Sequence, residues 1–420
     1  MRWPRIWVRC SFIGLTSLLP AAPAQGQVIT VLHSFTGGTS DGSGPGGSLL
    51  LSGTQLFGMT DGGGSAGDGT IFQLGTNGNG YAVAHSFAGL PNDGSNPHGS
   101  LIQSGLEFYG MTSGGGSANQ GTVFKVGANG TGYTLQHQFG GGANDGTGPL
   151  GSLIQSGTNF YGMTSLGGSA NQGTVFKIGT DGTGFNLLHS FTNSPADGRL
   201  PSYSSLVASG SALYGMTVGG GSADFGTVFK INADGTGFNL LHSFNAATGD
   251  GWQPYGSLTL SGSTLYGMTR QGGGGAGTIF DINTDGTGYA IMHTFAGSPG
   301  DGANPVGDLI VSGSSLFGTT PNGGADALGT LFGVHTDGTG YSVFYSFTGS
   351  PSDGANPGDV LLSDSILYGV TGAGGSNNLG TVFSFTPVPE PSSFLMVAAG
   401  GTVAFFVRRR QKNRCRVASR

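Results

Sequence analysis

The sequence predicts an all-β protein, a seven-bladed β-propeller with four-stranded blades, and three observations predict it. A block of 51 to 53 residues recurs seven times between residues 28 and 386. Each block holds four short apolar runs separated by glycine-rich turns. The region begins with one run and ends with three, and these two parts together make the seventh blade. A period near 50 with four strands is typical of propeller blades and matches Kelch repeats in length.

The repeat is carried by short elements that return at nearly constant spacing. Gly-Thr-(Val/Ile/Leu)-Phe begins at Gly69, Gly121, Gly173, Gly226, Gly277, Gly329 and Gly380. A Phe/Tyr-Gly pair precedes it, and a His-Ser-Phe type element follows it, with Tyr345 in place of the seventh histidine. With 87 Gly in 420 residues, low complexity would be the first reading. The regular spacing instead places the glycines at turns.

The third repeat shows the strands that we expect within one blade. They span residues 151–154 (strand A), 159–164 (strand B), 173–178 (strand C) and 185–191 (strand D). Strand C presents mostly apolar side chains on both faces, as stacking between two neighbouring blades requires. The connections from D to A and from B to C should share one face of the propeller.

The two ends of the repeat region predict how the ring closes. Residues 28–35 form a lone strand D, and residues 359–385 supply strands A, B and C with no strand D after them. The first strand therefore completes the last blade, which gives seven blades and removes exposed sheet edges. An open solenoid is the alternative, and it would leave both ends unpaired.

The first 24 residues are typical of a secretory signal peptide. Three arginines lie within the first ten residues, an apolar run spans residues 10–22, and small residues place the cleavage site at Ala24. A buried first helix is the alternative. The only cysteines, Cys10 and Cys415, lie in the terminal segments, so the region from 28 to 386 has no disulfide.

Residues 387–420 carry a three-part pattern. Pro389, Glu390 and Pro391 precede an apolar run over 394–407, and a basic tail follows, beginning at Arg408, Arg409 and Arg410. Fourteen helical residues cover about 21 Å, short of a ~30 Å hydrocarbon core. This order resembles the PEP-CTERM sorting signal. The resemblance implies transient anchoring at the inner membrane through 394–407, until an exosortase cleaves near Pro-Glu-Pro. An ordinary C-terminal membrane anchor is the alternative.

The repeat text is similar to the tandem GloVer repeats of surface-anchored bacterial proteins. The Tyr-Gly-Met-Thr, Gly-Gly and Gly-Thr-Val-Phe elements carry the resemblance over residues 28–386. In that family PEP-CTERM is one of several interchangeable anchors. The resemblance implies a propeller-like fold and a location at the surface or in the extracellular matrix of a Gram-negative bacterium. It implies no known reaction.

Charge excludes one class of partner. Between residues 28 and 386, 5 Lys and Arg stand against 20 Asp and Glu, a formal charge of −15. Nucleic-acid binding requires basic side chains that neutralise phosphates, so we expect no nucleic-acid partner.

Two periodic side chains suggest metal sites. Each D-to-A connection carries one Asp before Gly, and a rim of such carboxylates suits Ca²⁺; the set is Asp41, Asp93, Asp145, Asp197, Asp250, Asp301 and Asp353. Asp-Gly is also a turn former, which is the alternative. Six histidines recur in strand D, but equivalent atoms of neighbouring blades should be about 15 Å apart at the outer strands. We therefore expect these histidines to pack between blades and to bond nearby backbone, and we predict no cofactor apart from a possible Ca²⁺.

A ligand site is expected where one repeat departs from its siblings. Arg199 and Tyr203 lie in one such D-to-A connection, and Trp252 and Tyr255 lie in the next. Trp252 is the only tryptophan between residues 28 and 386. Aromatic rings beside Arg and Asp suit stacking on a sugar face with hydrogen bonds around it. Drift at loop tips is the alternative.

No catalytic constellation is apparent. The sequence lacks a His-Glu-x-x-His motif and a serine nucleophile elbow with plausible partners. The repeat region has one Glu, Glu107, so a glycosidase pair would need Asp residues. We therefore expect a non-enzymatic, structural or adhesive surface protein that binds exopolysaccharide. The alternative is a secreted carbohydrate-active enzyme or lectin that uses the D-to-A loops.

Overall fold

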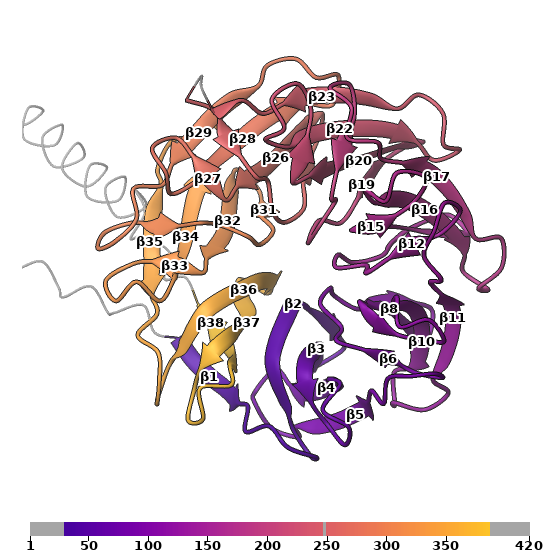
Figure 1. Cartoon of the computed structure of the whole chain (residues 1–420). Coiled ribbons are helices and arrows are strands. Elements are labelled where there is room, and N and C mark those ends of the chain that lie inside the picture. Colours follow the sequence, from indigo (N-terminus) through magenta and orange to yellow (C-terminus); the bar gives the residue numbers. More distant parts are fainter. Residues whose placement is uncertain (1–28, 247–248, 387–420) are drawn as a thin grey trace, which may run out of the picture.

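Seven four-stranded antiparallel sheets surround a central axis in the computed structural model, which describes residues 29–246 and 249–386 (Figure 1). This confirms the seven-bladed propeller. The predicted signal peptide with Ala24, the sorting motif at 389–391 and 408–410, and the apolar run at 394–407 all lie outside the described residues. Within the described residues, no helix has the length and apolar character needed to cross a membrane.

The first four blades share one strand order. Blade 1 contains β2 (Gly42–Ser52), β3 (Gln55–Gly63), β4 (Thr70–Gly75) and β5 (Ala82–Ser86). Blade 2 contains β7 (Ile102–Ser104), β8 (Glu107–Thr112), β10 (Thr122–Gly127) and β11 (Thr134–Gln138). Blade 3 contains β13 (Ile154–Ser156), β14 (Asn159–Thr164), β16 (Thr174–Gly179) and β17 (Asn186–Ser190). Blade 4 contains β19 (Val207–Ser209), β20 (Ala212–Thr217), β22 (Thr227–Asn232) and β23 (Asn239–Ser243).

The last three blades continue this order, and the seventh borrows its outer strand. Blade 5 contains β25 (Thr259–Ser261), β26 (Thr264–Thr269), β28 (Thr278–Asn283) and β29 (Ala290–Thr294). Blade 6 contains β31 (Ile310–Ser312), β32 (Ser315–Thr320), β34 (Thr330–His335) and β35 (Ser342–Ser346). Blade 7 contains β36 (Gly354–Ser363), β37 (Ile366–Gly374), β38 (Thr381–Phe385) and β1 (Ile29–Ser34).

Five short two-stranded ladders join each D-to-A connection to the following B-to-C loop. They are β6 (Gly94–Ser95) with β9 (Gly114–Gly115), β12 (Gly146–Thr147) with β15 (Leu166–Gly167), β18 (Gly198–Arg199) with β21 (Gly219–Gly220), β24 (Gly251–Trp252) with β27 (Gln271–Gly272), and β30 (Gly302–Ala303) with β33 (Asn322–Gly323). In blades 1 and 7 the longer strands include the same pairing. Both loop types therefore lie on one face, as predicted.

Ring closure is direct, because β1 pairs antiparallel with β38. Ile29 faces Phe385, and Ser34 faces Thr381. Phe35 is buried with Phe72 from blade 1 and Val382 from blade 7, so an apolar core spans the seam. The first and last strands lie side by side in Figure 1. The open-solenoid alternative is therefore excluded.

The two ends of blade 7 face opposite sides of the ring. Phe385 pairs with Leu367, next to the turn between β36 and β37. Thr381 pairs with Thr371, near the glycine-rich loop that joins β37 to β38. The described chain thus begins and ends on the face that carries the A-to-B turns, not on the face of the D-to-A connections.

The prediction for strand A was wrong in its bounds. In blade 3 the inner strand is Ile154–Ser156, whereas we expected 151–154. The reason is that the Ser152 amide donates to Oγ of Ser205 in the next blade, at 2.8 Å, and so does not join its own sheet. Strand B lies where it was predicted, and strands C and D differ by one residue at their ends.

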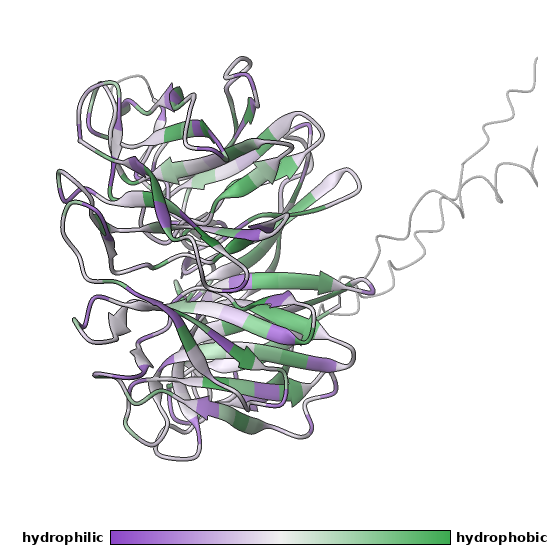
Figure 2. Ribbon diagram, turned by 90° about the vertical axis from the view of Figure 1, so that its right-hand side faces the viewer, coloured by the Kyte–Doolittle hydropathy of each residue, from purple (hydrophilic) through white to green (hydrophobic). Residues whose placement is uncertain are grey.

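Apolar contacts between neighbouring blades form the core. Seven clusters of buried side chains each combine residues of two neighbouring blades. In Figure 2 the green, hydrophobic colour is concentrated on the strands, and the loops are mostly pale or purple. The glycine of the Phe/Tyr-Gly pair is required by this packing, because a Cβ on Gly162 would lie 2.6 Å from Cζ of Phe176. The glycine that opens Gly-Thr-Val-Phe has a positive φ, +101° at Gly173, which disfavours other residues.

Candidate functional site at the channel mouth

A ring of hydrogen bonds surrounds the central channel at the start of the inner strands. In six successive steps, a backbone amide of one blade donates to a side-chain oxygen of the next at 2.5–2.9 Å. We call this set the channel ring; its members are Ser48, Ser100, Ser152, Ser205, Ser257, Asp308 and Asp359. Five blades thus use a serine where blades 6 and 7 use an aspartate.

The channel ring borders a cavity of about 470 Å³, to which all seven blades contribute. Its lining comes from the residues that lead into each inner strand and from a few B-to-C loop residues, including Arg270 and Pro321. The cavity therefore opens on the face of the D-to-A connections. Its volume is in the range of small-molecule sites.

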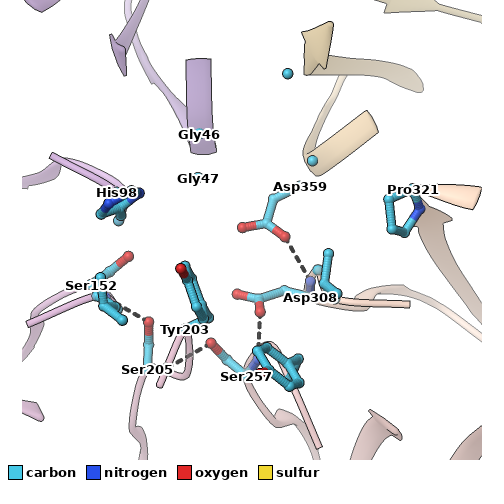
Figure 3. Close-up of a pocket in the computed structure, with 18 of the residues that line it drawn as sticks. Gly46, Gly47, His98, Ser152, Tyr203, Ser205, Ser257, Asp308, Pro321 and Asp359 are labelled. Atoms are coloured by element: carbon cyan, nitrogen blue, oxygen red, sulfur yellow. Dashed lines mark hydrogen bonds between the residues drawn. The ribbon is translucent and has the colours of Figure 1, made fainter. Parts of the chain in front are cut away.

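Asp308 and Asp359 present a pair of carboxyl groups on one wall of the cavity (Figure 3). Oδ1 of Asp308 accepts the Ser257 amide at 2.5 Å, and Oδ1 of Asp359 accepts the Asp308 amide at 2.7 Å. The second oxygen of each carboxyl group points into the cavity. Burial raises the pKa of both groups, and the charge of Asp308 raises the pKa of Asp359 further, to about 8. Near neutral pH the pair therefore retains a proton.

Aromatic and basic side chains form another part of the lining. The rings of Tyr203 and Tyr255 stack with centroids 5.7 Å apart at an angle of 28°. The guanidinium of Arg270 lies 5.4 Å from the centroid of the Tyr255 ring, a cation–π contact. His98 meets the edge of Tyr203, and its Nδ1 lies 3.2 Å from Asp61 Oδ1. Burial raises the pKa of Tyr203, so its hydroxyl stays protonated at neutral pH.

Of the four residues that we predicted as a ligand site, two line the cavity and two lie outside it. Tyr203 and Tyr255 meet in the cavity. Arg199 does not line it but forms a bidentate ion pair with Asp224, at 2.7 and 3.0 Å. Trp252 packs edge-on against Phe225, with centroids 5.5 Å apart. A sugar site at Arg199 and Trp252 stays a prediction, separate from the cavity.

The seven aspartates predicted for Ca²⁺ each hold a neighbouring strand in place. In six blades the histidine of strand D brings Nε2 within 2.8–3.2 Å of this carboxylate. In blade 6 Tyr345 takes the place of the histidine in strand D, and its hydroxyl donates to Asp353 at 2.9 Å. We call each such pair a latch. Each latch carboxylate also accepts a backbone amide, as Asp41 does from Gly42 at 2.7 Å.

The latch histidines do pack between blades, as expected, but their bond goes to a carboxylate and not to backbone. Each of the six rings stacks on an aromatic ring of the next blade with centroids 3.5–4.1 Å apart, the partners being Tyr81, Tyr133, Phe185, Phe238, Tyr289 and Tyr341. Within residues 29–246 and 249–386, no three His, Cys, Asp or Glu side chains are grouped to hold a metal ion. The Ca²⁺ prediction itself stays untested.

Hydrogen bonds control the ionisation of the latch carboxylates. Burial alone would raise the pKa of Asp41, but hydrogen bonds from His33 and Tyr81 outweigh it and hold that pKa well below its usual range. The same causes lower the pKa of Asp93 and Asp250. These carboxylates are therefore ionised at neutral pH and engaged with protein donors.

Sequence analysis missed Asp308, Asp359 and Arg270. The signal for the first two was readable, because Gly-Ser-Leu becomes Gly-Asp-Leu at 307–309 and Gly-Asp-Val at 358–360. The rule that located Tyr203 and Tyr255, departure from sibling repeats, applies equally there. Arg270 follows a Met-Thr element whose other copies precede small, acidic or apolar residues, and it is likewise a departure.

Two overlapping segments, residues 21–212 and 194–383, match the Gloeobacter/Verrucomicrobia repeat. The chain belongs to this repeat family. A second match, over residues 387–411, is the PEP-CTERM protein-sorting motif. Together they identify an exported, exosortase-sorted protein of the Gram-negative cell surface or extracellular space. No curated protein sequence matches the chain.

Solved structures resemble this repeat protein at low sequence identity. An oligogalacturonate lyase in complex with manganese is 11% identical with a TM-score of 0.51, over 88% of this chain and 95% of the lyase. A chain of a nidogen–laminin complex is 14% identical with a TM-score of 0.42, over 70% of this chain and 93% of that one. At 11% identity the likeness to the lyase shows the fold alone.

Proposed function

We propose that this protein is an adhesive component of the cell surface or extracellular matrix, and that it holds exopolysaccharide at the channel mouth. The observation that carries the proposal is the stacked pair Tyr203 and Tyr255 in a cavity of about 470 Å³. Aromatic faces in a concave site, with a few polar groups around them, suit the C–H face and hydroxyl groups of a sugar. The sorting signal supports this proposal, because it directs export to the cell surface or extracellular space.

Binding of purified full-length protein to exopolysaccharide tests the proposal. Tyr255→Ala and Tyr203→Ala should each weaken binding about tenfold, because each removes part of the aromatic surface. Trp252→Ala is the matched control, since Trp252 is also a partly exposed aromatic side chain of a D-to-A connection but lies outside the cavity. Equal binding by the tyrosine variants and the unsubstituted protein would exclude the cavity. Loss with Trp252→Ala alone would move the site to the predicted rim position.

Glycoside hydrolysis is a second candidate, and the proton retained between Asp308 and Asp359 favours it. Hydrolysis needs one protonated carboxyl group as an acid and one ionised group as a base. The acid gives its proton to the glycosidic oxygen as the C–O bond breaks, and the base takes a proton from the water that attacks the sugar carbon. Release of reducing ends from a bound polysaccharide, abolished by Asp308→Asn and by Asp359→Asn, would support it. Intact polysaccharide after long incubation would leave adhesion as the function.

A further inference from the structure

The channel ring has aspartate in place of serine at blades 6 and 7, and this difference affects which ligands the cavity can bind. In blades 2 to 5 a serine hydroxyl accepts the amide of the preceding blade. Asp308 does the same with Oδ1 and has a second oxygen left over, as does Asp359. Serine would suffice for the ring itself, so the ring does not explain the carboxyl groups.

The two remaining oxygens both point into the cavity (Figure 3), where Asp308 also interacts with the Ser257 side chain and no protein donor is recorded among the described residues for the second oxygen of Asp359. Carboxyl oxygens accept hydrogen bonds from hydroxyl groups, and a charged acceptor forms stronger bonds than a neutral one. A ligand that offers donors to this wall would satisfy both groups.

A second observation is independent of the acid pair. Nε of Arg270, a lining residue, is buried and has no hydrogen-bond partner within the part of the chain that the structure describes. A buried donor without an acceptor is costly. The lining thus lacks donors at one place and an acceptor at another, and a sugar hydroxyl can serve as either.

We propose that the cavity takes a neutral sugar unit and rejects the corresponding uronate. The sugar's hydroxyl groups donate to Asp308 and Asp359, its face lies against Tyr203 and Tyr255, and one of its oxygens accepts from Arg270. This inference rests on the proposed function and names the class of glycan that the cavity binds.

Like-charge repulsion is the physical reason for the rejection. A uronate carboxylate brought beside two partly buried carboxyl groups adds negative charge where burial already disfavours it. Arg270 opposes this effect, because its guanidinium could pair with a uronate. Its contact with the Tyr255 ring places that cation at the aromatic surface. The acidic body, with a formal charge of −15 over residues 28–386, adds to the repulsion.

Matched pairs of oligosaccharides test the inference on the full-length protein. The probes are oligomers of glucose, galactose and mannose, each beside the oligomer of its own uronic acid at equal length, with affinity measured by calorimetry at pH 7. At least one neutral oligomer should bind at least tenfold more tightly than its uronate. Binding of none of the six probes would overturn the proposed function. Binding of a uronate as tightly as its neutral partner would overturn this inference and leave the adhesive function standing.

Serine substitution supplies a variant that keeps the fold. Asp308→Ser combined with Asp359→Ser restores the residue that five blades use, so the ring hydrogen bonds should survive, and a melting temperature no lower than that of the unsubstituted protein checks this. Neutral-sugar affinity should fall about tenfold to hundredfold, and the discrimination against uronate should shrink. Arg270→Gln should weaken neutral binding several-fold. Unchanged affinity and discrimination in the double-serine variant would overturn the role of the carboxyl pair.

Discussion

The backbone amide of Asp308 donates to Oδ1 of Asp359 at 2.7 Å, so two acidic side chains are neighbours in the channel ring. The same step in blades 1 to 4 joins an amide to a serine hydroxyl. The protein therefore keeps two acidic side chains together at its channel mouth, where a neutral residue would complete the ring. Such an arrangement costs stability, and that cost can be measured.

Asp359→Ser should stabilise the protein, and more at pH 8 than at pH 5. The pKa of Asp359 is raised to about 8 in the folded state, against about 4 in the unfolded chain. Raising the pH from 4 to about 8 therefore lowers the free energy of unfolding, because the unfolded chain loses the Asp359 proton at about pH 4 and the folded protein loses it only near pH 8. We expect a gain of at least ~1 kcal/mol in the free energy of unfolding at pH 8. Urea unfolding at the two pH values measures it, with exposed Asp326→Ser as the control for the loss of one negative charge.

The latches should give the opposite dependence on pH. Five latch carboxylates have a pKa lowered by hydrogen bonds that outweigh burial, namely Asp41, Asp93, Asp145, Asp197 and Asp250. Their stabilisation is present above about pH 4, the unfolded value, and is lost as the pH falls through the folded values. The free energy of unfolding should therefore drop between pH 5 and pH 3. Asp197→Asn should show a shallower drop, and an equal drop in that variant would contradict this account.

Tyr289→Phe should cost about 0.5–1.5 kcal/mol, the contribution of one hydrogen bond. The Tyr289 hydroxyl donates to Asp250, whose carboxylate still accepts from His242 at 2.8 Å. Phe185 stands at the equivalent place beside His137, so the fold accepts phenylalanine there. Phe185→Tyr is the reciprocal variant and should gain a similar amount. Thermal unfolding of both variants checks the prediction, and shifts of the same sign would count against it.

Val31→Pro should open the ring. Val31 faces Phe383 within the β1–β38 ladder, and proline lacks the amide donor and is poorly tolerated inside a ladder. Loss of this pairing exposes β38 as an edge, so we expect a lower melting temperature and association in size-exclusion chromatography. Val31→Ala keeps the backbone donor and serves as the control. A monomeric Val31→Pro protein with unchanged melting would show that closure does not depend on this pairing.

The fold was largely predictable because the same pattern of strands and turns recurs seven times in the sequence. The single strand at residues 28–35 and the absence of a fourth strand after residue 385 predicted that the ring closes. The pairing of β1 with β38 confirms this. The bounds of the inner strand were not predictable from one blade. The amide of Ser152 bonds to the neighbouring blade, and a contact between repeats leaves no pattern inside one of them.

The site was predictable only in part. Tyr203 and Tyr255 stand out as departures from the repeat, and the structure brings them together. Arg199 and Trp252 stand out equally, yet Asp224 and Phe225 satisfy them locally. Departure from a repeat thus marks a candidate, but whether its partner is a ligand or a nearby side chain depends on packing that only the structure shows.

Ring closure also fixes a direction. Ile29 and Phe385 are paired on the face of the A-to-B turns, whereas Asp359 and Gly372 line the cavity at the opposite end of the same blade. The described chain therefore ends on the side of the propeller that lies opposite the cavity. Attachment of the propeller through that end of the described chain would leave the cavity mouth uncovered and open to a soluble polymer.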